Sequence, residues 1–228
     1  MPNDNVEMVE RGLQKRLETY LPLARRFLLN DLELPAQFVG SPHELRCYIN
    51  GKWTHLFLVM ERSILPLERV FGADAVKCPQ QGACFQPGEH DAIMFMPDLI
   101  AAEAEEAGIT PAALTEILIA HECLHATMMA HLNPLKPGPG RDWVSEKKFR
   151  FIHEALALRF CAELPRLTDG RILEEDVQRY LDFVELKSKT GPDGYAYSPY
   201  FDQYAGEPNT QFWRKLSAGL TEADMLPG

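Results

Sequence analysis

Apolar residues recur at helical spacing over most of the chain, which predicts a largely helical protein. The first such stretch is interrupted near Pro22, because proline removes a backbone hydrogen-bond donor from a helix. Later stretches of the same period are separated by glycine and proline residues. The predicted helices are Asn5 to Leu29, His55 to Phe71, a segment ending near Gly108, Thr110 to Asn133, Trp143 to Leu164, Asp169 to Lys187, and two short helices that bracket Gly206.

Three short apolar runs between turn signals predict β-strands at Leu45 to Ile49, Ala75 to Cys78 and Ala92 to Met96. The pattern therefore indicates an α+β class, mostly helical, with a small sheet packed beside the helix that starts at Thr110. A chain of 228 residues has the length of one domain. We expect residues 1–50 to form a helix and strand that lead into a domain over residues 51–228, the two making one compact unit.

The helix that starts at Thr110 carries two histidines on one face. Thr110 suits the N-cap position and Pro111 the first helical position. Further along, His121 and His125 are four residues apart, so their rings can bind one metal ion. Glu122 follows the first histidine directly and can act as a general base without filling a coordination position. This is the HExxH pattern of zinc metalloproteases.

A catalytic zinc ion normally takes three protein ligands, and three residues are candidates for the third. His131 has a suitable spacing, but Met128 stands where a chain-turning glycine is needed, and a continuing helix carries His131 about 9 Å beyond the motif. Glu154 lies on an apolar helix face, where a metal would compensate the carboxylate; an ion pair with Arg150 is the alternative. His153 fits core packing as well as a role at the metal. Glu154 is the preferred ligand.

With the segment Glu154-Ala155-Leu156-Ala157, the sequence resembles the gluzincin branch of zinc metallopeptidases, in which a Glu from a following helix completes HExxH. The resemblance implies a zincin-like fold and one Zn²⁺ held by His121, His125 and Glu154. It also implies that the strand Ala92 to Met96 is an edge strand, which binds an extended peptide by main-chain pairing.

The same resemblance directs attention to a tyrosine-rich segment downstream of the Glu helix. Tyr197 is the first choice for the donor that stabilises the transition state, with Tyr200, Tyr195 and His153 as alternatives. One departure from the family pattern is Leu158, which replaces an Asp that steadies a zinc-binding histidine in several gluzincins. Another group must therefore support that ligand.

Composition and charge narrow the possible partners. The net charge of −10 argues against nucleic acid and against an anionic membrane surface. The sequence shows neither a secretory signal nor the run of about 20 apolar residues that a membrane helix needs. Five scattered cysteines suit free thiols in a reducing compartment. We expect a cytoplasmic chain, although leaderless export would leave the same sequence.

These observations predict a zinc-dependent hydrolase, specifically a metallopeptidase that cleaves a peptide or protein substrate with a zinc-activated water and Glu122 as general base. The alternative is a metal-binding or regulatory module of the same fold without turnover. A third possibility is an all-helical interaction protein in which the motif occurs by chance. The intact Glu122 favours the enzyme, because metal binding alone does not require it.

Overall fold

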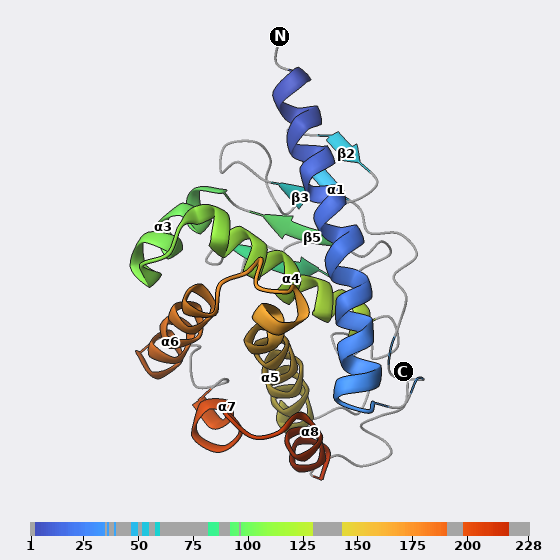
Figure 1. The fold of residues 1–228 in the computed structure, drawn as a ribbon, viewed down its shortest axis with the longest axis vertical. Helices are drawn as coiled ribbons and strands as arrows, with labels where there is room; N and C mark the ends of the chain where they lie inside the picture. Colours follow the sequence, from blue (N-terminus) through green and yellow to red (C-terminus); the bar gives the residue numbers. More distant parts are fainter. Residues whose placement is uncertain are drawn as a thin grey trace.

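Most of the described chain is helical (Figure 1). The computed structural model describes residues 3–34, 36, 39, 47–49, 52–54, 58–59, 82–86, 92–95, 97–129, 143–190 and 198–218. Its helices are α1 (Asn3–Arg26), the π-helix η1 (Phe27–Asp31), α3 (Pro97–Ala107), α4 (Pro111–Met129), α5 (Trp143–Leu167), α6 (Glu174–Thr190), α7 (Ser198–Gln203) and α8 (Asn209–Ser217). Among the described helices, none combines the length and hydrophobicity that a membrane-spanning segment requires.

Helix α4 lies at the centre of the described helices. Every residue from Ile117 to Met128 is buried, so the helix presents no solvent-facing side over this stretch. A helix that is covered on all sides needs packing partners around it, and α1 and α5 are its main partners. The candidate histidines of α4 are therefore held inside the core.

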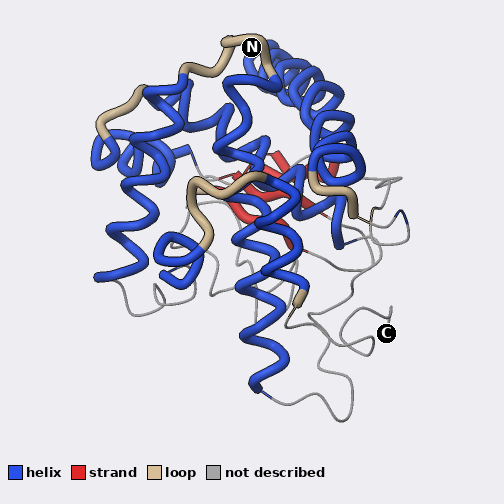
Figure 2. Tube along the Cα trace, turned by 60° about the horizontal axis from the view of Figure 1, so that its bottom comes forward, coloured by secondary structure: helices blue, strands red, loops and turns tan. Residues whose placement is uncertain are grey.

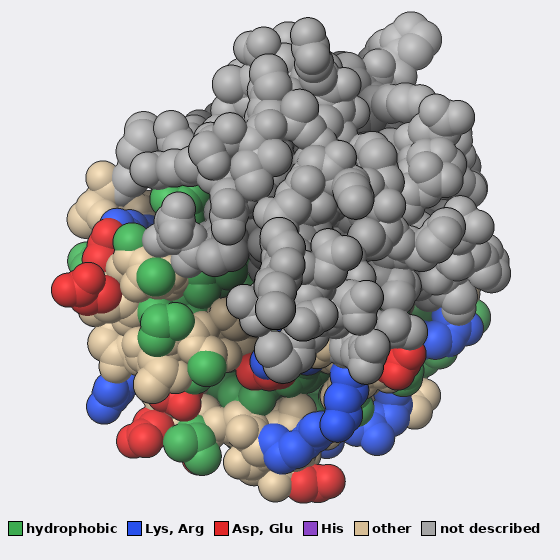
Figure 3. All heavy atoms as spheres, turned by 90° about the horizontal axis from the view of Figure 1, so that it is seen from above, with side chains coloured by type: hydrophobic (Ala, Val, Ile, Leu, Met, Phe, Trp, Pro, Cys, Tyr) green, Lys and Arg blue, Asp and Glu red, His purple; other side chains and the backbone are tan. Residues whose placement is uncertain are grey.

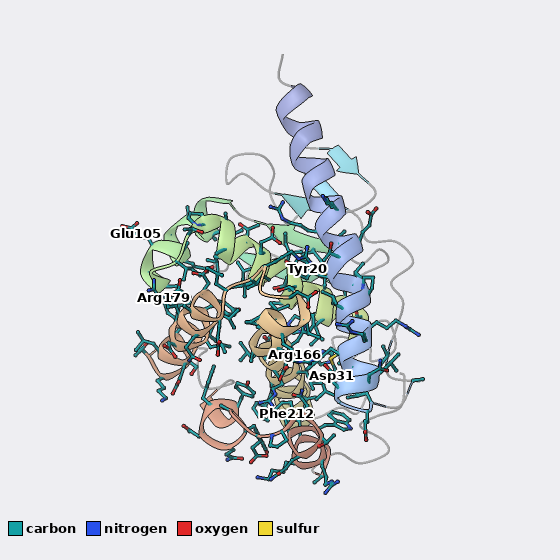
Figure 4. The ribbon with its side chains drawn as sticks, viewed as in Figure 1. Tyr20, Asp31, Glu105, Arg166, Arg179 and Phe212 are labelled. Carbon is teal, nitrogen blue, oxygen red and sulfur yellow. The ribbon has the colours of Figure 1, made fainter. Side chains whose placement is uncertain are left out.

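Helix α1 is fastened to α4 by a polar contact. Glu116 of α4 accepts a hydrogen bond of 2.7 Å from the Tyr20 hydroxyl with one carboxylate oxygen and pairs with the Arg16 guanidinium through the other. Figure 4 shows Tyr20 between the two helices. At the end of α1 the chain continues into the wider turn of η1, closed by the Leu32 amide donating to the Phe27 carbonyl at 3.0 Å. Phe27 is fully buried, and its ring centroid lies 5.2 Å from that of Phe160 in α5. The predicted helix over Asn5 to Leu29 is confirmed, but the predicted interruption near Pro22 was wrong, because α1 continues through this proline to Arg26.

The described strands are two to four residues long: β1 (Cys47–Ile49), β2 (Lys52–Thr54), β3 (Leu58–Val59), β4 (Ala83–Gln86) and β5 (Ala92–Phe95). Their order is β2-β1-β3-β5-β4, with antiparallel pairing of β1 to β2 and of β4 to β5, and parallel pairing of β3 to its two neighbours. β5 pairs with strands on both sides, through Met94 to Leu58 and to Cys84. The prediction that this strand is a free edge for a peptide was therefore wrong.

The predicted fold class is also corrected. The mostly helical character is confirmed, but the α+β class with a zincin-like sheet packed beside the motif helix was wrong, because helices rather than a sheet build the described structure around that helix. Among the strand side chains whose burial is described, Ala83 and Ile93 enter the core, whereas helices contribute most of its remaining residues. Figure 2 shows the strands as a small patch among the helices. Short apolar runs are compatible with strands, but here most of the buried apolar residues lie in helices.

Several boundaries also differ from the predictions. β3 lies inside the predicted helix His55 to Phe71, and the predicted strand Ala75 to Cys78 lies outside the described residues. α5 continues through Pro165 and ends where Asp169 and Gly170 take positive φ angles of 52° and 75°. This left-handed turn, closed by the Gly170 amide donating to the Pro165 carbonyl at 2.8 Å, delays the start of α6 to Glu174.

Candidate metal centre

The N-terminus of α4 sets the register of the two motif histidines. Thr110 is the N-cap, since its hydroxyl accepts a hydrogen bond of 3.1 Å from the Ala113 amide, and Pro111 is the first helical residue. About three and four turns downstream, His121 and His125 share one face of the helix. Their Nε2 atoms lie 3.0 Å apart and their ring centroids 4.7 Å apart. Each residue is 7% exposed.

Helix α5 brings Glu154 to these imidazoles. Its Oε2 lies 3.2 Å from Nε2 of His121 and 3.5 Å from Nε2 of His125. The Glu154 side chain is 27% exposed, more than either imidazole, so the cluster lies near an opening of the core rather than deep within it. The structure thus brings together the three residues that the sequence suggested as ligands.

The spacing of these three atoms suits a small metal ion. Ligands at about 2.0–2.1 Å from a tetrahedral zinc ion lie roughly 3.3 Å from one another. The three separations in this cluster, 3.0, 3.2 and 3.5 Å, are close to that value. Two imidazole nitrogens and one carboxylate oxygen can therefore bind a metal ion without rearrangement of the helices.

The imidazoles also control the charge on Glu154. Burial alone would raise the pKa of this carboxyl, but His125 and His121 hold its pKa well below the usual range. The carboxylate therefore stays ionised and ready to bind a cation.

His153 is close to the cluster but does not belong to it. Its ring centroid lies 6.0 Å from that of His125, and the residue is 6% exposed. Burial, then the neighbouring His125, lowers the pKa of His153 to about 3, against an opposing effect of Glu154. Neither ring nitrogen has a hydrogen-bond partner among the described residues. His153 is therefore a neutral, buried imidazole beside the candidate site.

Glu122 lies next to His121 on α4 and is 4% exposed. Its charge reaches both buried thiols near the site: burial, followed by Glu122, raises the pKa of Cys123 and of Cys161 well above the ordinary value. Glu122 therefore lies in the same buried region as the candidate ligands, but it is not one of the three residues that offer a ligand atom.

The tyrosine candidates separate into two groups. Tyr197 and Tyr195 lie outside the described residues, as does His131. Tyr200, in α7, is 2% exposed, and its ring packs edge-on against Phe212 with centroids 5.8 Å apart. Burial raises the pKa of Tyr200 to about 12, although a nearby guanidinium opposes the shift. The contacts of Tyr200 are those of a core residue, and Tyr197 remains a prediction.

Two residues near the site were not assigned a role from the sequence. Cys161 of α5 places its Sγ 3.8 Å from Nδ1 of His121. Tyr180 of α6 is 5% exposed, and burial, then charges that include Cys161 and Glu154, raises its pKa well above the ordinary value. Cys161 follows Glu154 by two helical turns, and this spacing was the available signal for it. Tyr180 had no comparable signal, because a tyrosine on an apolar helix face usually packs in the core.

Comparison with protein-family models, with curated proteins and with solved structures gave no match. On the face shown in Figure 3, the described side chains include both acidic and basic groups. The geometry around His121, His125 and Glu154 is therefore the basis for assigning a function to the chain.

Proposed function

We propose that this chain is a zinc-dependent hydrolase that acts as a metallopeptidase on a peptide or protein substrate. One observation carries the proposal: three ligand atoms from two helices lie 3.0–3.5 Å apart, and Glu122, the residue after the ligand His121, is buried in the same helix. These three residues are the ligands that the gluzincin resemblance implies. We propose the ligands and the hydrolytic chemistry of that branch for this chain, but not its fold.

Zinc is the metal that suits these donors best. Imidazole nitrogen combined with carboxylate oxygen is typical of catalytic zinc sites, which keep three protein ligands and one open position. The cluster offers three ligands among the described residues. When bound there, zinc would supply a Lewis acid that polarises the scissile carbonyl.

Glu122 is the proposed general base. Its carboxylate takes a proton from the attacking water and gives it to the leaving amine, which balances the hydrolysis of the peptide bond. A site that only holds metal has no need for a carboxylate next to a ligand, because Glu122 does not supply one of the three ligand atoms. The presence of Glu122 therefore favours an enzyme over a module that binds metal without turnover. Tyr197 remains the proposed donor to the oxyanion.

The first experiment measures metal content by mass spectrometry after purification without chelator. We expect about one zinc per chain in the wild type and a loss in both His121→Ala and Glu154→Ala. Glu163→Ala is the matched control, because Glu163 lies on the same helix but pairs with Arg166. Absence of metal from the wild type after incubation with Zn²⁺ would refute the proposal.

The second experiment tests turnover with a peptide library whose cleavage products are identified by mass spectrometry. We expect Glu122→Gln to keep zinc and to lose cleavage by a factor of at least about 100. Unchanged cleavage in this variant would remove Glu122 from the mechanism. A wild type that holds zinc but cleaves no peptide would support the metal-binding module instead. Tyr197→Phe at full turnover would eliminate Tyr197 as the donor.

A further inference from the structure

The imidazole of His121 has contacts on two sides. Its Nε2 faces Oε2 of Glu154 at 3.2 Å and Nε2 of His125 at 3.0 Å, so this nitrogen belongs to the candidate metal position. Its other nitrogen, Nδ1, lies 3.8 Å from Sγ of Cys161. This separation suits a long N–H···S hydrogen bond, in which sulfur is a weak acceptor.

Metal binding would fix which nitrogen of His121 carries the proton. If Nε2 gives its lone pair to the metal, the proton must be on Nδ1, and metal-binding histidines almost always donate this second N–H to a fixed partner. Among the described residues, Cys161 is the partner that the structure gives this nitrogen. The carboxylate that commonly takes this role is not available from Leu158, which is buried and apolar.

Helix α5 is suited to supply both contacts. Glu154 and Cys161 are separated by two helical turns and so lie on one face, which packs against α4. Cys161 is fully buried, and a buried sulfur has little freedom to leave the imidazole edge. One helix therefore contacts the His121 ring at Nε2 through Glu154 and near Nδ1 through Cys161.

We propose that Cys161 is a positioning residue, whose sulfur accepts a hydrogen bond from Nδ1–H of His121 and orients that ring for metal binding. The inference rests on the proposed function, since it requires Nε2 of His121 to be a metal ligand. Cys161 itself stays outside the coordination sphere, because its sulfur lies at the opposite nitrogen of the ring.

The test compares Cys161→Ala, Cys161→Ser and Cys123→Ala in the full chain, with Zn²⁺ alone as the probe and a chromophoric chelator as competitor. Cys123 is the matched control, because it is an equally buried thiol close to the site on α4. We expect Cys161→Ala to weaken zinc binding about 10- to 100-fold, a typical loss when the partner of a ligand is removed. Cys161→Ser should restore most of the affinity, because a hydroxyl oxygen also accepts a hydrogen bond. Cys123→Ala should bind zinc like the wild type.

A second readout separates orientation from packing. Cobalt-substituted protein should show altered visible ligand-field bands in Cys161→Ala but not in Cys123→Ala, and no thiolate-to-cobalt charge-transfer band in the wild type. Thermal unfolding of the metal-free variants checks that each one folds. If Cys161→Ala does not fold, Cys161→Ser is compared with the wild type instead. The measured quantity is then the chemical shift of the His121 Nδ1–H proton in NMR spectra.

The outcomes distinguish this inference from the proposed function. Equal zinc affinity of Cys161→Ala and Cys123→Ala would overturn the inference and leave the zinc site intact. An equal loss in Cys161→Ala and Cys161→Ser would also overturn it, because packing rather than a hydrogen bond would then be responsible. A wild type that binds no zinc would overturn the proposed function and the inference together.

Discussion

Oε2 of Glu154 lies 3.2 Å from Nε2 of His121, and this contact joins α5 to α4 at the candidate metal position. Because the ligands come from both helices, a metal ion bound between them would also hold the helices together. Metal binding should therefore be measurable as a change in stability, whatever reaction the site performs.

The first prediction concerns this coupling. Zn²⁺ at a free concentration 100-fold above its Kd should raise the free energy of unfolding by about 2.7 kcal/mol, because the metal binds the folded chain and the unfolded chain lacks the assembled site. Chemical denaturation with and without Zn²⁺ measures the difference. His121→Ala should show no increase, whereas Glu163→Ala should keep it. An equal increase in His121→Ala would mean that Zn²⁺ binds elsewhere on the chain.

The sequence was sufficient to locate the helices that carry the site. The apolar period, together with Thr110 and Pro111, predicted where α4 begins, and the histidine spacing follows from helical geometry. Glu154 could be chosen because its helical neighbours are apolar and a lone carboxylate there needs compensation. Each of these features depends on residues close together in the chain.

The features that the sequence did not predict depend on tertiary packing. The contact of Cys161 with His121 requires the crossing of α5 on α4, which no local spacing determines. β3 falls in a segment with helical periodicity, and β5 lies between two strands rather than at an edge, because strand pairing partners are distant in sequence.

The second prediction concerns His153, a buried imidazole whose nitrogens lack partners among the described residues. His153→Leu should raise the free energy of unfolding by about 1–3 kcal/mol, because an unpaired buried polar group is replaced by an apolar one of similar size. Urea denaturation of the metal-free protein measures it. Zinc affinity should be unchanged, since His153 is not among the ligand atoms.

The neighbouring Ile152→Leu is the control for His153→Leu. It conserves volume at a buried position, so its effect should be below about 1.5 kcal/mol. If His153→Leu instead lowered the free energy of unfolding by more than this control, His153 would have a stabilising partner and the prediction would be wrong.

The third prediction concerns Arg159, which joins α5 to the segment around α8. Its Nε donates to Oδ1 of Asn209 at 2.6 Å, its Nη2 donates to the Glu207 carbonyl, and its guanidinium lies over the Phe212 ring, 5.5 Å from the centroid. Arg159→Met should lower the free energy of unfolding by about 3 kcal/mol, because it leaves both acceptors unpaired while it keeps most of the apolar stem. Denaturation monitored by circular dichroism measures the loss.

Arg166→Met is the matched control on the same helix. Arg166 pairs with Asp31 and Glu163, but its side chain is 57% exposed, so this substitution should cost less than about 1 kcal/mol. Figure 4 shows Arg166 and Asp31 close to each other. Equal losses in the two variants would show that the buried contacts of Arg159 add nothing beyond an exposed ion pair.

The last prediction concerns Tyr200 at high pH. Folding raises its pKa from 10.0 to about 12, chiefly by burial, so the folded state favours the neutral phenol. The stabilisation that comes from this preference is complete below the unfolded pKa and is lost as pH rises from 10.0 toward about 12. The free energy of unfolding of the wild type should therefore fall relative to Tyr200→Phe by about 1.4 kcal/mol per pH unit over this window. Urea denaturation at about pH 8 and about pH 11 measures the difference.

Phe212→Leu is the control, because it removes packing from the same cluster without removing a titrating group. Its loss in the free energy of unfolding relative to the wild type should be the same at both pH values. A difference between the wild type and Tyr200→Phe that stays constant across the window would show that the phenol of Tyr200 reaches solvent.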